Sequence, residues 1–356
     1  MEYAAIKRDE QLDIYRAMSM MYVLCVTHVV YWLYIGLEPI KSLILVEMPI
    51  IFFITGASLS LTKKKSFRKA LKNRTKRVLI PYYIYSLVIL ICILLLSIFW
   101  HFFLRQITSI IGAEKAYNHA YDITAYKWED ILNIIGIVDI SQAHFVYHLW
   151  FILPYLILTC TFGYQINLIQ KMNRWVYVLL CIVLFSISQA FEIHHFFTTL
   201  LGYNIFIVVG YLFYRRIKTW QVIVVCFFAI VTLIAYILPT GDFCPMQNHK
   251  FPPDWLFVTY NIIILCLLSL MLERLTFPST KVFRLWNTRG YTIYLYQSVV
   301  FTLVDPFYKL FVSKIDLLII QWAICALLVW SLSTILSYIT YPFEQYMMSK
   351  MKSIIQ

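Results

Sequence analysis

Three ionisable residues near the start of the sequence, His28, Glu47 and Arg16, are of the types that carry chemistry. His28 and Glu47 lie deep within the first two long apolar segments, and Arg16 lies near the start of the first. Ionisable side chains inside such segments are costly to bury, so they are functional candidates by default. An imidazole exchanges protons near neutral pH, and a carboxylate beside it orients the ring and raises its basicity. These residues therefore indicate acid–base or nucleophilic chemistry.

The positions of His28 and Glu47 predict that the two side chains meet. His28 stands eight residues before Gly36, where the first segment ends, and Glu47 stands seven residues after Ile40, where the second begins. A short connection makes the two helices antiparallel neighbours, and at 1.5 Å per residue both side chains lie about 10–12 Å from the same end. The alternative is that Glu47 sits at the membrane interface and His28 packs against a neighbouring backbone.

A basic segment at residues 63–77 supplies nine cations. Within it, Arg74 and Arg77 are three residues apart, which places two guanidinium groups on one helix face, where they can share a phosphate. Apolar residues recur near one face of the same segment, so we expect an amphipathic helix along the inner membrane surface. The alternative role of these cations is to bind anionic lipid and to orient the chain in the membrane.

Two further candidates, His148 and Trp150, flank the start of a later apolar segment in the sequence HFVYHLWF. His, Trp and Tyr at such places are commonly interface residues. The sequence contains no GxSxG motif, no HExxH motif and no Gly-rich phosphate loop. Seven of the eight cysteines lie inside apolar runs without metal-binding spacing, so we expect neither disulfides nor a metal site.

The elements that must position these residues are membrane-spanning helices. Of the 356 residues, 61% are hydrophobic and 13% are charged, and the mean hydropathy is +0.74. This composition excludes a soluble enzyme, a secreted disulfide scaffold and a disordered protein. The apolar runs do not alternate as barrel strands do, so we predict an all-α integral membrane protein with about ten transmembrane helices. The predicted segments are 14–35, 41–62, 79–104, 147–165, 175–191, 196–214, 219–238, 255–273, 291–313 and 316–341.

The basic residues orient this bundle. With a cytoplasmic N-terminus, 23 of the 30 Lys and Arg residues fall in inner segments and seven in outer ones. This asymmetry follows the positive-inside rule and predicts that both termini are cytoplasmic. Because insertion in the lipid bilayer explains most of the net charge of +12, nucleic acid is not an expected partner. We expect one polytopic domain over residues 1–356 without a cleavable signal peptide, with long outer loops at 105–146 and 239–254.

Several ordered motifs resemble the membrane-bound acyltransferase family 3. The opening LDIYRAMSMMYVLCVTH is similar to the family pattern of an Asp, then an Arg near the start of span one, then a His deep within it. In this chain those residues are Asp13, Arg16 and His28. PIIFFITGASL, RTKRVLIPYYIY, HLWFILPYL and RGYTIYLYQ follow in the order in which the family carries similar elements. The resemblance covers about residues 10–345 and implies an enzyme that moves acyl groups, usually acetyl, onto cell-surface glycans.

Two departures from the family pattern affect candidate residues. Eleven residues separate Arg16 from His28, where the family usually has ten. Twelve steps of 100° leave these side chains about 120° apart on an α-helix, so either a π-bulge restores the alignment or Arg16 does not face His28. A late span carries Gln297 where the family often has His, so a titratable group is not expected there.

The resemblance also implies roles on the donor side. His28 would act as a general base on a sugar hydroxyl or as a transient acyl carrier, with Glu47 and Arg16 as further catalytic residues. Acetyl-CoA would be the acyl donor, and its phosphates would rest on Arg74 and Arg77 at the cytoplasmic face. No metal is implied.

On the acceptor side, the resemblance implies a glycan or a lipid-linked glycan at the bacterial inner membrane. His148, Trp150 and Trp128 would contact it, since aromatic rings suit sugar rings. Two other functions fit the same spans. A transporter or flippase for lipid-linked sugars or acylated intermediates would work without acetyl-CoA. A non-catalytic membrane partner in glycan export would tolerate the loss of His28.

Overall fold

The computed structural model describes residues 9–33, 35–62, 66–99, 127–137, 145–241, 243, 245–272 and 275–354. Over these ranges the chain consists of helices and their connections, and the strand-like pairing found there is one isolated bridge between Lys250 and Pro253. The prediction of an all-α membrane protein is confirmed. The outer loop predicted at 105–146 is described only at 127–137 and from 145 onward.

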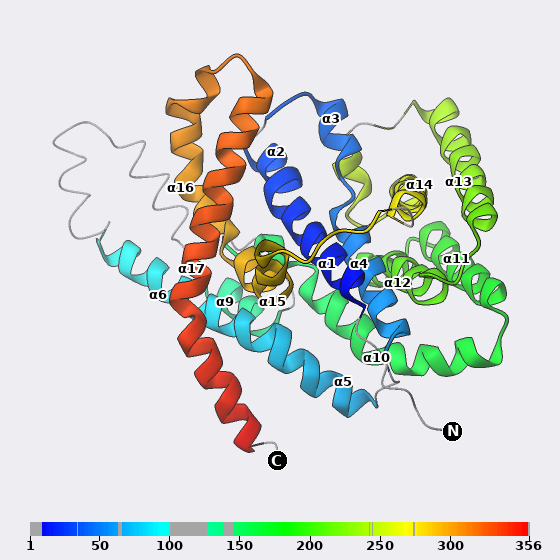
Figure 1. Cartoon of the computed structure of the whole chain (residues 1–356), viewed down its shortest axis with the longest axis horizontal. Helices are drawn as coiled ribbons and strands as arrows, with labels where there is room; N and C mark the ends of the chain where they lie inside the picture. The colour runs from blue at the N-terminus through cyan, green and yellow to red at the C-terminus, as the bar shows by residue number, and fades with distance from the viewer. Residues whose placement is uncertain are drawn as a thin grey trace.

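The helices follow one another along the chain as labelled in Figure 1. They are α1 (Glu10–Tyr22), the π-helix η1 (Val23–His28), α2 (Val29–Trp32), α3 (Glu38–Leu43), α4 (Glu47–Ser60), α5 (Phe67–Arg74), the π-helix η2 (Thr75–Leu79), α6 (Ile80–Phe99), α9 (Trp128–Gly136), the 3-10 helix η4 (Tyr147–Leu149), α10 (Ile152–Lys171), α11 (Arg174–Ala190), α12 (His195–Phe213), α13 (Thr219–Thr240), the 3-10 helix η5 (Met246–His249), α14 (Trp255–Leu272), α15 (Lys281–Leu295), α16 (Gln297–Leu310), the 3-10 helix η6 (Val312–Lys314) and α17 (Leu318–Ile354).

Eight helical stretches within the described ranges are long and apolar enough to cross a membrane, and each corresponds to one of the ten predicted segments. The remaining two segments differ. α11 is apolar but has 17 residues. The segment predicted at 291–313 is divided into α15 and α16 at Tyr296. α15 also begins earlier than predicted, at Lys281, because the Thr280 side chain caps it by accepting from the backbone N–H of Phe283.

The first span contains a π-helix between Arg16 and His28. α1 passes directly into η1 and then into α2, so that Glu10–Trp32 forms one span. A π-helical turn holds its hydrogen bonds from residue i to i+5, so it accommodates one residue more than an α-helical turn. Of the two alternatives left open by the Arg16–His28 spacing, the structure shows the π-bulge.

The second span is interrupted inside the bundle. α3 ends at Leu43 and α4 begins at Glu47, and the residues between them are not helical. This break places Glu47 in the first turn of a helix. Unpaired backbone N–H groups and the positive end of the helix dipole favour a carboxylate at that position.

Two glycines fix the position of α4 against α12. A Cβ atom added to Gly56 of α4 would lie 2.0 Å from the carbonyl oxygen of Ile207, and one added to Gly210 of α12 would lie 2.0 Å from that of Phe53. Small residues permit such backbone-to-backbone packing between membrane helices. The register of α4, and with it the position of Glu47, therefore depends on these two glycines.

The described part of the basic segment forms a helix with no buried residue, and this helix is continuous with the third span. α5 continues through η2 into α6, so one helix runs from Phe67 into the bundle. Ser66 caps its start by accepting from the backbone N–H of Lys69. Because this helix is unbroken, the third span sets the positions of the basic side chains of α5 and η2.

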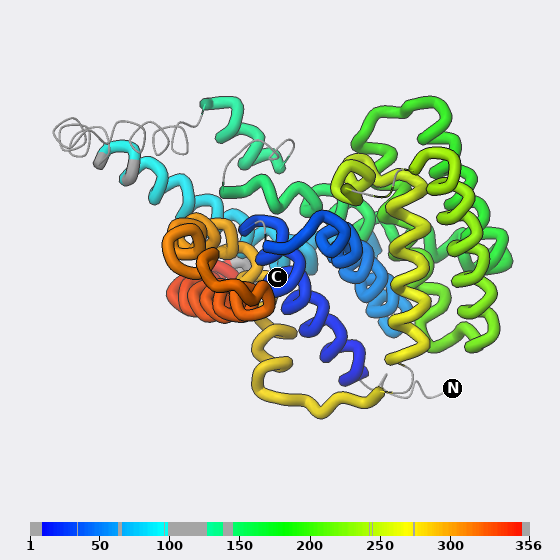
Figure 2. The backbone as a smooth tube through the Cα atoms, turned by 90° about the horizontal axis from the view of Figure 1, so that it is seen from above, coloured from blue at the N-terminus to red at the C-terminus, as the bar shows by residue number. Residues whose placement is uncertain are grey.

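The elements expected on the two sides of the membrane lie at opposite ends of the bundle. In Figure 1, α3 and the connection from α16 to α17 lie toward the upper edge, whereas α5 and the end of α17 lie toward the lower edge. Figure 2 shows α1 between α16 and α17 on one side and α12–α14 on the other. The largest buried cluster includes Phe52, Tyr85, Phe206 and Phe257 from α4, α6, α12 and α14.

Candidate active site

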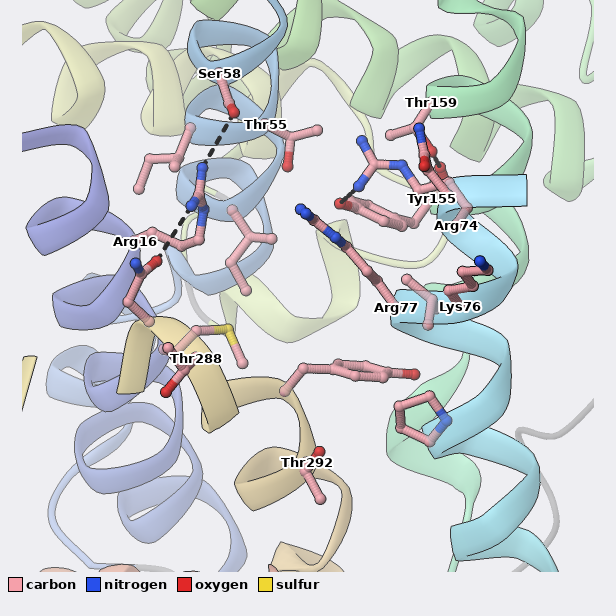
Figure 3. A pocket seen from close by; sticks show the side chains of 18 of the residues that line it. Arg16, Thr55, Ser58, Arg74, Lys76, Arg77, Tyr155, Thr159, Thr288 and Thr292 are labelled. Atoms are coloured by element: carbon pink, nitrogen blue, oxygen red, sulfur yellow. Dashed lines mark hydrogen bonds between the residues drawn. The ribbon is translucent and has the colours of Figure 1, made fainter. Parts of the chain in front are cut away.

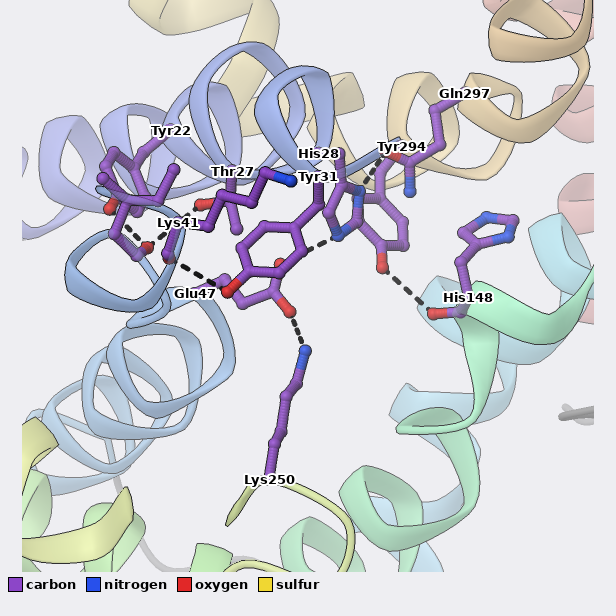
Figure 4. Close-up of polar contacts among 11 residues, drawn as sticks. Tyr22, Thr27, His28, Tyr31, Lys41, Glu47, His148, Lys250, Tyr294 and Gln297 are labelled. Carbon is purple, nitrogen blue, oxygen red and sulfur yellow. Dashed lines mark hydrogen bonds and ion pairs between the residues drawn. The ribbon is translucent and has the colours of Figure 1, made fainter. Parts of the chain in front are cut away.

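His28 lies at the centre of a buried polar cluster (Figure 4). It is the last residue of η1, and its two ring nitrogens have different neighbours. Nε2 lies 2.8 Å from Oε2 of Glu47. Nδ1 lies 2.6 Å from Oε1 of Gln297, the first residue of α16. The contact between His28 and Glu47 that their matched depths predicted is present.

The second carboxylate oxygen of Glu47 is paired with Lys250, from the segment between α13 and α14. Both side chains are buried, and Nζ of Lys250 lies 5.8 Å from the ring centroid of Trp150 and 4.9 Å from that of Phe251. A buried carboxylate needs a compensating charge, because its desolvation is otherwise too costly. Glu47 therefore has two partners, one from the first span and one from a distant connection.

Aromatic side chains enclose His28. Its ring stacks on Trp32, with 4.8 Å between centroids and 11° between planes, and Tyr294 lies 5.8 Å away. His148 contacts the same two rings, at 5.7 Å from Trp32 and 5.4 Å from Tyr294. The sequence pattern allowed a place for His148 at the membrane interface, but η4 turns it inward and buries it beside the His28 cluster.

A cavity of about 790 Å³ lies within the bundle, between α1, α4, η2, α10, α15 and α17 (Figure 3). Its volume is in the range of sites for cofactors and other small molecules. Cations outnumber acids among its lining side chains, so it suits an anionic ligand. The cations are Arg16, Arg74, Lys76, Arg77 and Arg289, and the acids are Asp13 and Glu344.

Arg74 and Arg77 both line this cavity. Nη1 of Arg74 donates to the hydroxyl of Tyr155 at 2.9 Å, and its guanidinium lies over the Tyr155 ring at 5.2 Å. Arg77, in η2, extends into the cavity, and no hydrogen bond or ion pair joins it to another residue that the structure describes. A guanidinium group without a protein partner is available to a ligand anion.

Arg16 also faces the cavity, and it does not contact His28. Its guanidinium lies 2.9 Å from Oδ1 of Asp13, 3.2 Å from Oδ1 of Asn287 and 3.1 Å from Oγ of Ser58. Arg16 and His28 nevertheless project toward the same helix, because Ser58 and Glu47 both belong to α4. Ser58 lies eleven positions after Glu47, which is about 16 Å along the helix at 1.5 Å per residue. The π-helix thus aligns Arg16 with His28 on one face but at different depths.

Tyr294 separates the cavity from the His28 cluster. It lines the cavity and contacts the His28 ring, and its hydroxyl donates to the backbone carbonyl of His148 at 3.1 Å. Phe151, which also lines the cavity, packs edge-on against Tyr294 at 5.7 Å. A ligand in the cavity is therefore one aromatic side chain away from His28.

The two tryptophans expected to contact an acceptor are placed differently. Trp150 packs against Tyr203 at 5.5 Å and lies beside Lys250, next to Glu47. Trp128 begins α9 and is 80% exposed, and no contact joins it to His28 or Glu47 in the part of the chain that the structure describes. The structure brings Trp150 to the cluster and leaves Trp128 at the surface.

A family model described as an acyltransferase domain matches residues 9–341. The chain belongs to acyltransferase family 3. The match confirms the family that the ordered motifs suggested, and this protein is a membrane acyltransferase. The matched range includes the His28–Glu47 pair and the arginines that line the cavity. No curated protein and no solved structure matches the chain.

Lys250 and Tyr294 escaped the sequence analysis, and Gln297 was noted there only as a departure from the family pattern. Lys250 belongs to the connection between α13 and α14, which was expected on the outer side, where a lysine is normally solvated. Nothing in the hydropathy shows that its backbone enters the bundle. Tyr294 and Gln297 lie within the quoted motif RGYTIYLYQ, but only the packing of α15 and α16 brings them to His28. The motif RGYTIYLYQ was therefore the one available sequence signal. It covers Tyr294 and Gln297 but not Lys250.

Proposed function

We propose that this acyltransferase transfers an acetyl group from cytoplasmic acetyl-CoA to a hydroxyl of a cell-surface or lipid-linked glycan at the bacterial inner membrane. The observation that carries the proposal is the presence, in one bundle, of an arginine-lined cavity and a buried His–carboxylate pair with Tyr294 between them. A binding site for a phosphorylated donor and a proton-transferring centre are the two parts that such a reaction requires.

The cavity supports CoA as the donor. CoA carries a pyrophosphate and a 3′-phosphate, and guanidinium groups bind phosphate through charge-assisted hydrogen bonds. Arg16, Arg74 and Arg77 surround one space, and we assign all three to the donor. This assignment changes the expected role of Arg16 from catalysis to binding. The pantetheine arm would carry the thioester over the distance of about 16 Å from the level of Arg16 to that of His28.

At the cluster, we assign His28 as the general base. The neutral imidazole takes the proton of the acceptor hydroxyl while the oxygen attacks the thioester carbonyl. A C–O bond forms, the C–S bond breaks, and the proton passes from His28 to the CoA thiolate. Because Glu47 holds Nε2, the nitrogen that exchanges the proton is Nδ1, and the acceptor hydroxyl would displace the Gln297 amide from that nitrogen. The alternative, an acyl group carried on His28, would leave an acylimidazole that rapid quenching can trap.

The acceptor is proposed to approach from the end of the bundle where Lys250 and Trp150 lie. The ring of Trp150 is beside the cluster, and the imidazole of His148 shares the aromatic neighbours of His28. We assign both to the acceptor. Trp128 on the exposed start of α9 is retained as a surface contact for the glycan.

The test is transfer of labelled acetyl from acetyl-CoA to glycan by wild type and by His28→Ala at equal protein level. We expect the variant to lose transfer while it still binds acetyl-CoA, because His28 does not line the cavity. Glu47→Gln should also slow transfer. A flippase would instead move lipid-linked sugar without incorporating acetyl. Transfer by His28→Ala near the wild-type rate would remove His28 from the chemistry, and absence of acetyl incorporation by wild type would contradict the proposed reaction.

A further inference from the structure

Lys250 belongs to an outer connection, yet its side chain lies inside the bundle. The residue is 4% exposed, and its Nζ pairs with Oε1 of Glu47. Burial of an ammonium group carries a large desolvation penalty, which is offset only where a charge partner and good packing are present. Lysines that serve topology or solubility remain at the surface, so the placement of Lys250 requires a different explanation.

The backbone around Lys250 is fastened to three other parts of the chain. The fully buried Met246 donates its N–H to Oγ of Ser42 in α3, at 2.9 Å. The carbonyl of Pro253 accepts from Nε2 of Gln189 in α11, at 2.9 Å. The segment then passes directly into α14. Lys250 is therefore held at Glu47 by its backbone as well as by its charge.

The charges of Lys250 and Glu47 bear on the protonation of His28. The two opposite charges cancel, so the cluster is neutral as a whole when the His28 imidazole is neutral. If Lys250 lost its charge, the cluster would be neutral only with a protonated His28. Net charge in a low-dielectric interior is unfavourable, so Lys250 favours the unprotonated ring that a general base requires. Among the described residues, the titratable neighbours of the cluster include Tyr294 of α15, in contact with His28, and His148 of η4, beside them. Tyr22 and Tyr203 lie near Glu47.

Gln297 can hydrogen-bond His28 in both protonation states. Nε2 faces a carboxylate and therefore carries a proton in each state. The amide oxygen of Gln297 accepts from Nδ1 of the imidazolium, and the amide turned by 180° donates to the lone pair of the neutral ring. Nε2 of Gln297 makes no hydrogen bond of normal geometry in the described part of the chain, and the hydroxyl of Tyr294 lies next to the amide.

We propose that Lys250 is a positioning residue for acyl transfer, which keeps His28 unprotonated by neutralising Glu47. The outer segment Met246–Asp254 would then complete the reaction centre. This inference rests on the proposed function, because it concerns the base that the proposed reaction uses.

The test compares Lys250→Met, Lys250→Arg and the double variant Glu47→Gln/Lys250→Met with wild type. Lys309→Met is the matched control, since Lys309 is also expected on the outer side and is ion-paired to Asp305, but its side chain is 68% exposed. The first readout is the rate of acetyl transfer at neutral pH. The second is the charge of the His28 ring, from ¹⁵N NMR of histidine-labelled protein with His28→Ala to identify the signals.

We expect Lys250→Met to transfer at least about tenfold more slowly and to show a protonated His28, since a tenfold rate change is the smallest that a lost charge partner normally causes. Lys250→Arg should keep most of the rate, because it keeps the charge. The double variant should return His28 to the neutral form and transfer faster than Lys250→Met. Lys309→Met should behave as wild type.

A neutral His28 in Lys250→Met, or a double variant no faster than the single one, would show that Lys250 serves packing alone and would overturn the inference. If Lys250→Met does not fold, Lys250→Gln takes its place in both readouts. The NMR readout needs no acceptor. A wild type without glycan acetylation would therefore contradict the proposed function while the effect of Lys250 on His28 is still decided.

Discussion

His28 and Arg77 differ in the number of hydrogen-bonding partners that other residues of the protein provide. Each ring nitrogen of His28 has a side-chain neighbour from another helix, Glu47 of α4 or Gln297 of α16. Arg77 extends into the cavity without a hydrogen-bonding partner among the described residues. A preformed cluster suits a reaction centre, where geometry must not depend on the ligand, and a free guanidinium suits a site that the ligand completes.

At the residue scale, Arg77→Ala is expected to weaken acetyl-CoA binding by roughly ten- to a hundredfold, because a hydrogen bond to a charged group contributes about 1.5–3 kcal/mol. Arg77→Lys should restore only part of the affinity, since lysine lacks the planar fork. Lys72→Ala is the control, because Lys72 belongs to the same basic segment but does not line the cavity. Equal, small losses at Arg77 and Lys72 in a binding assay on purified protein would favour the lipid-binding role instead.

The two π-helices set the directions in which site residues project. η1 ends at His28, and η2 contains Arg77. A π-helical turn adds one residue to a helix without ending it, and this rotates every following side chain relative to those before it. In the first span that rotation brings His28 toward α4, on the face that already carries Arg16.

This argument predicts that the first span tolerates a deletion better than an insertion. Removing Val26 takes the extra residue out of η1, so the stretch can become α-helical with Arg16 and His28 still on one face. We expect this variant to bind acetyl-CoA and to keep measurable transfer. An alanine inserted after Val26 should turn His28 by about 100° and abolish transfer. Loss of transfer in both variants at normal protein level would show that the π-helix itself, and not the alignment, is required.

In the whole molecule, the basic cavity and the His28–Glu47 cluster receive residues from opposite ends of the helical bundle. The basic cavity residues lie on the third span, near the start of the first and on α15, in segments assigned to the cytoplasmic side. Lys250 enters from a connection assigned to the outer side. A donor and an acceptor held in different compartments can react at such a centre without either crossing the membrane.

At this scale the charge asymmetry predicts the topology. A tag at Gln356 should be inaccessible from outside intact cells, and a tag inserted near Tyr121 should be accessible, because both termini are assigned to the cytoplasm and the 105–146 loop to the outer side. Labelling with a membrane-impermeant reagent, with permeabilised cells as the control, measures this. Labelling of the C-terminal tag in intact cells would contradict the predicted orientation.

The amino-acid sequence was sufficient to predict the fold class, the family and the residues that could pair. Apolar runs must become helices in lipid, whatever their neighbours, because no other open structure satisfies the backbone there. The spacing of His28 and Glu47 around a short connection was enough to predict their contact, and the Arg16–His28 spacing was enough to suggest a π-bulge. Each of these inferences needed only geometry within one or two helices.

Which residues share a site became clear only from the packing of the helices. The sequence grouped Arg16 with His28, but the bundle places Arg16 in the cavity with Arg77, about 16 Å along α4 from the cluster. It also brings Lys250 to Glu47 across 203 positions of the chain. The direction of a buried side chain is set by long-range packing, such as the Gly56–Gly210 contact of α4 with α12, and a loop enters a bundle only where other elements bind it. Neither condition leaves a local signal in the sequence.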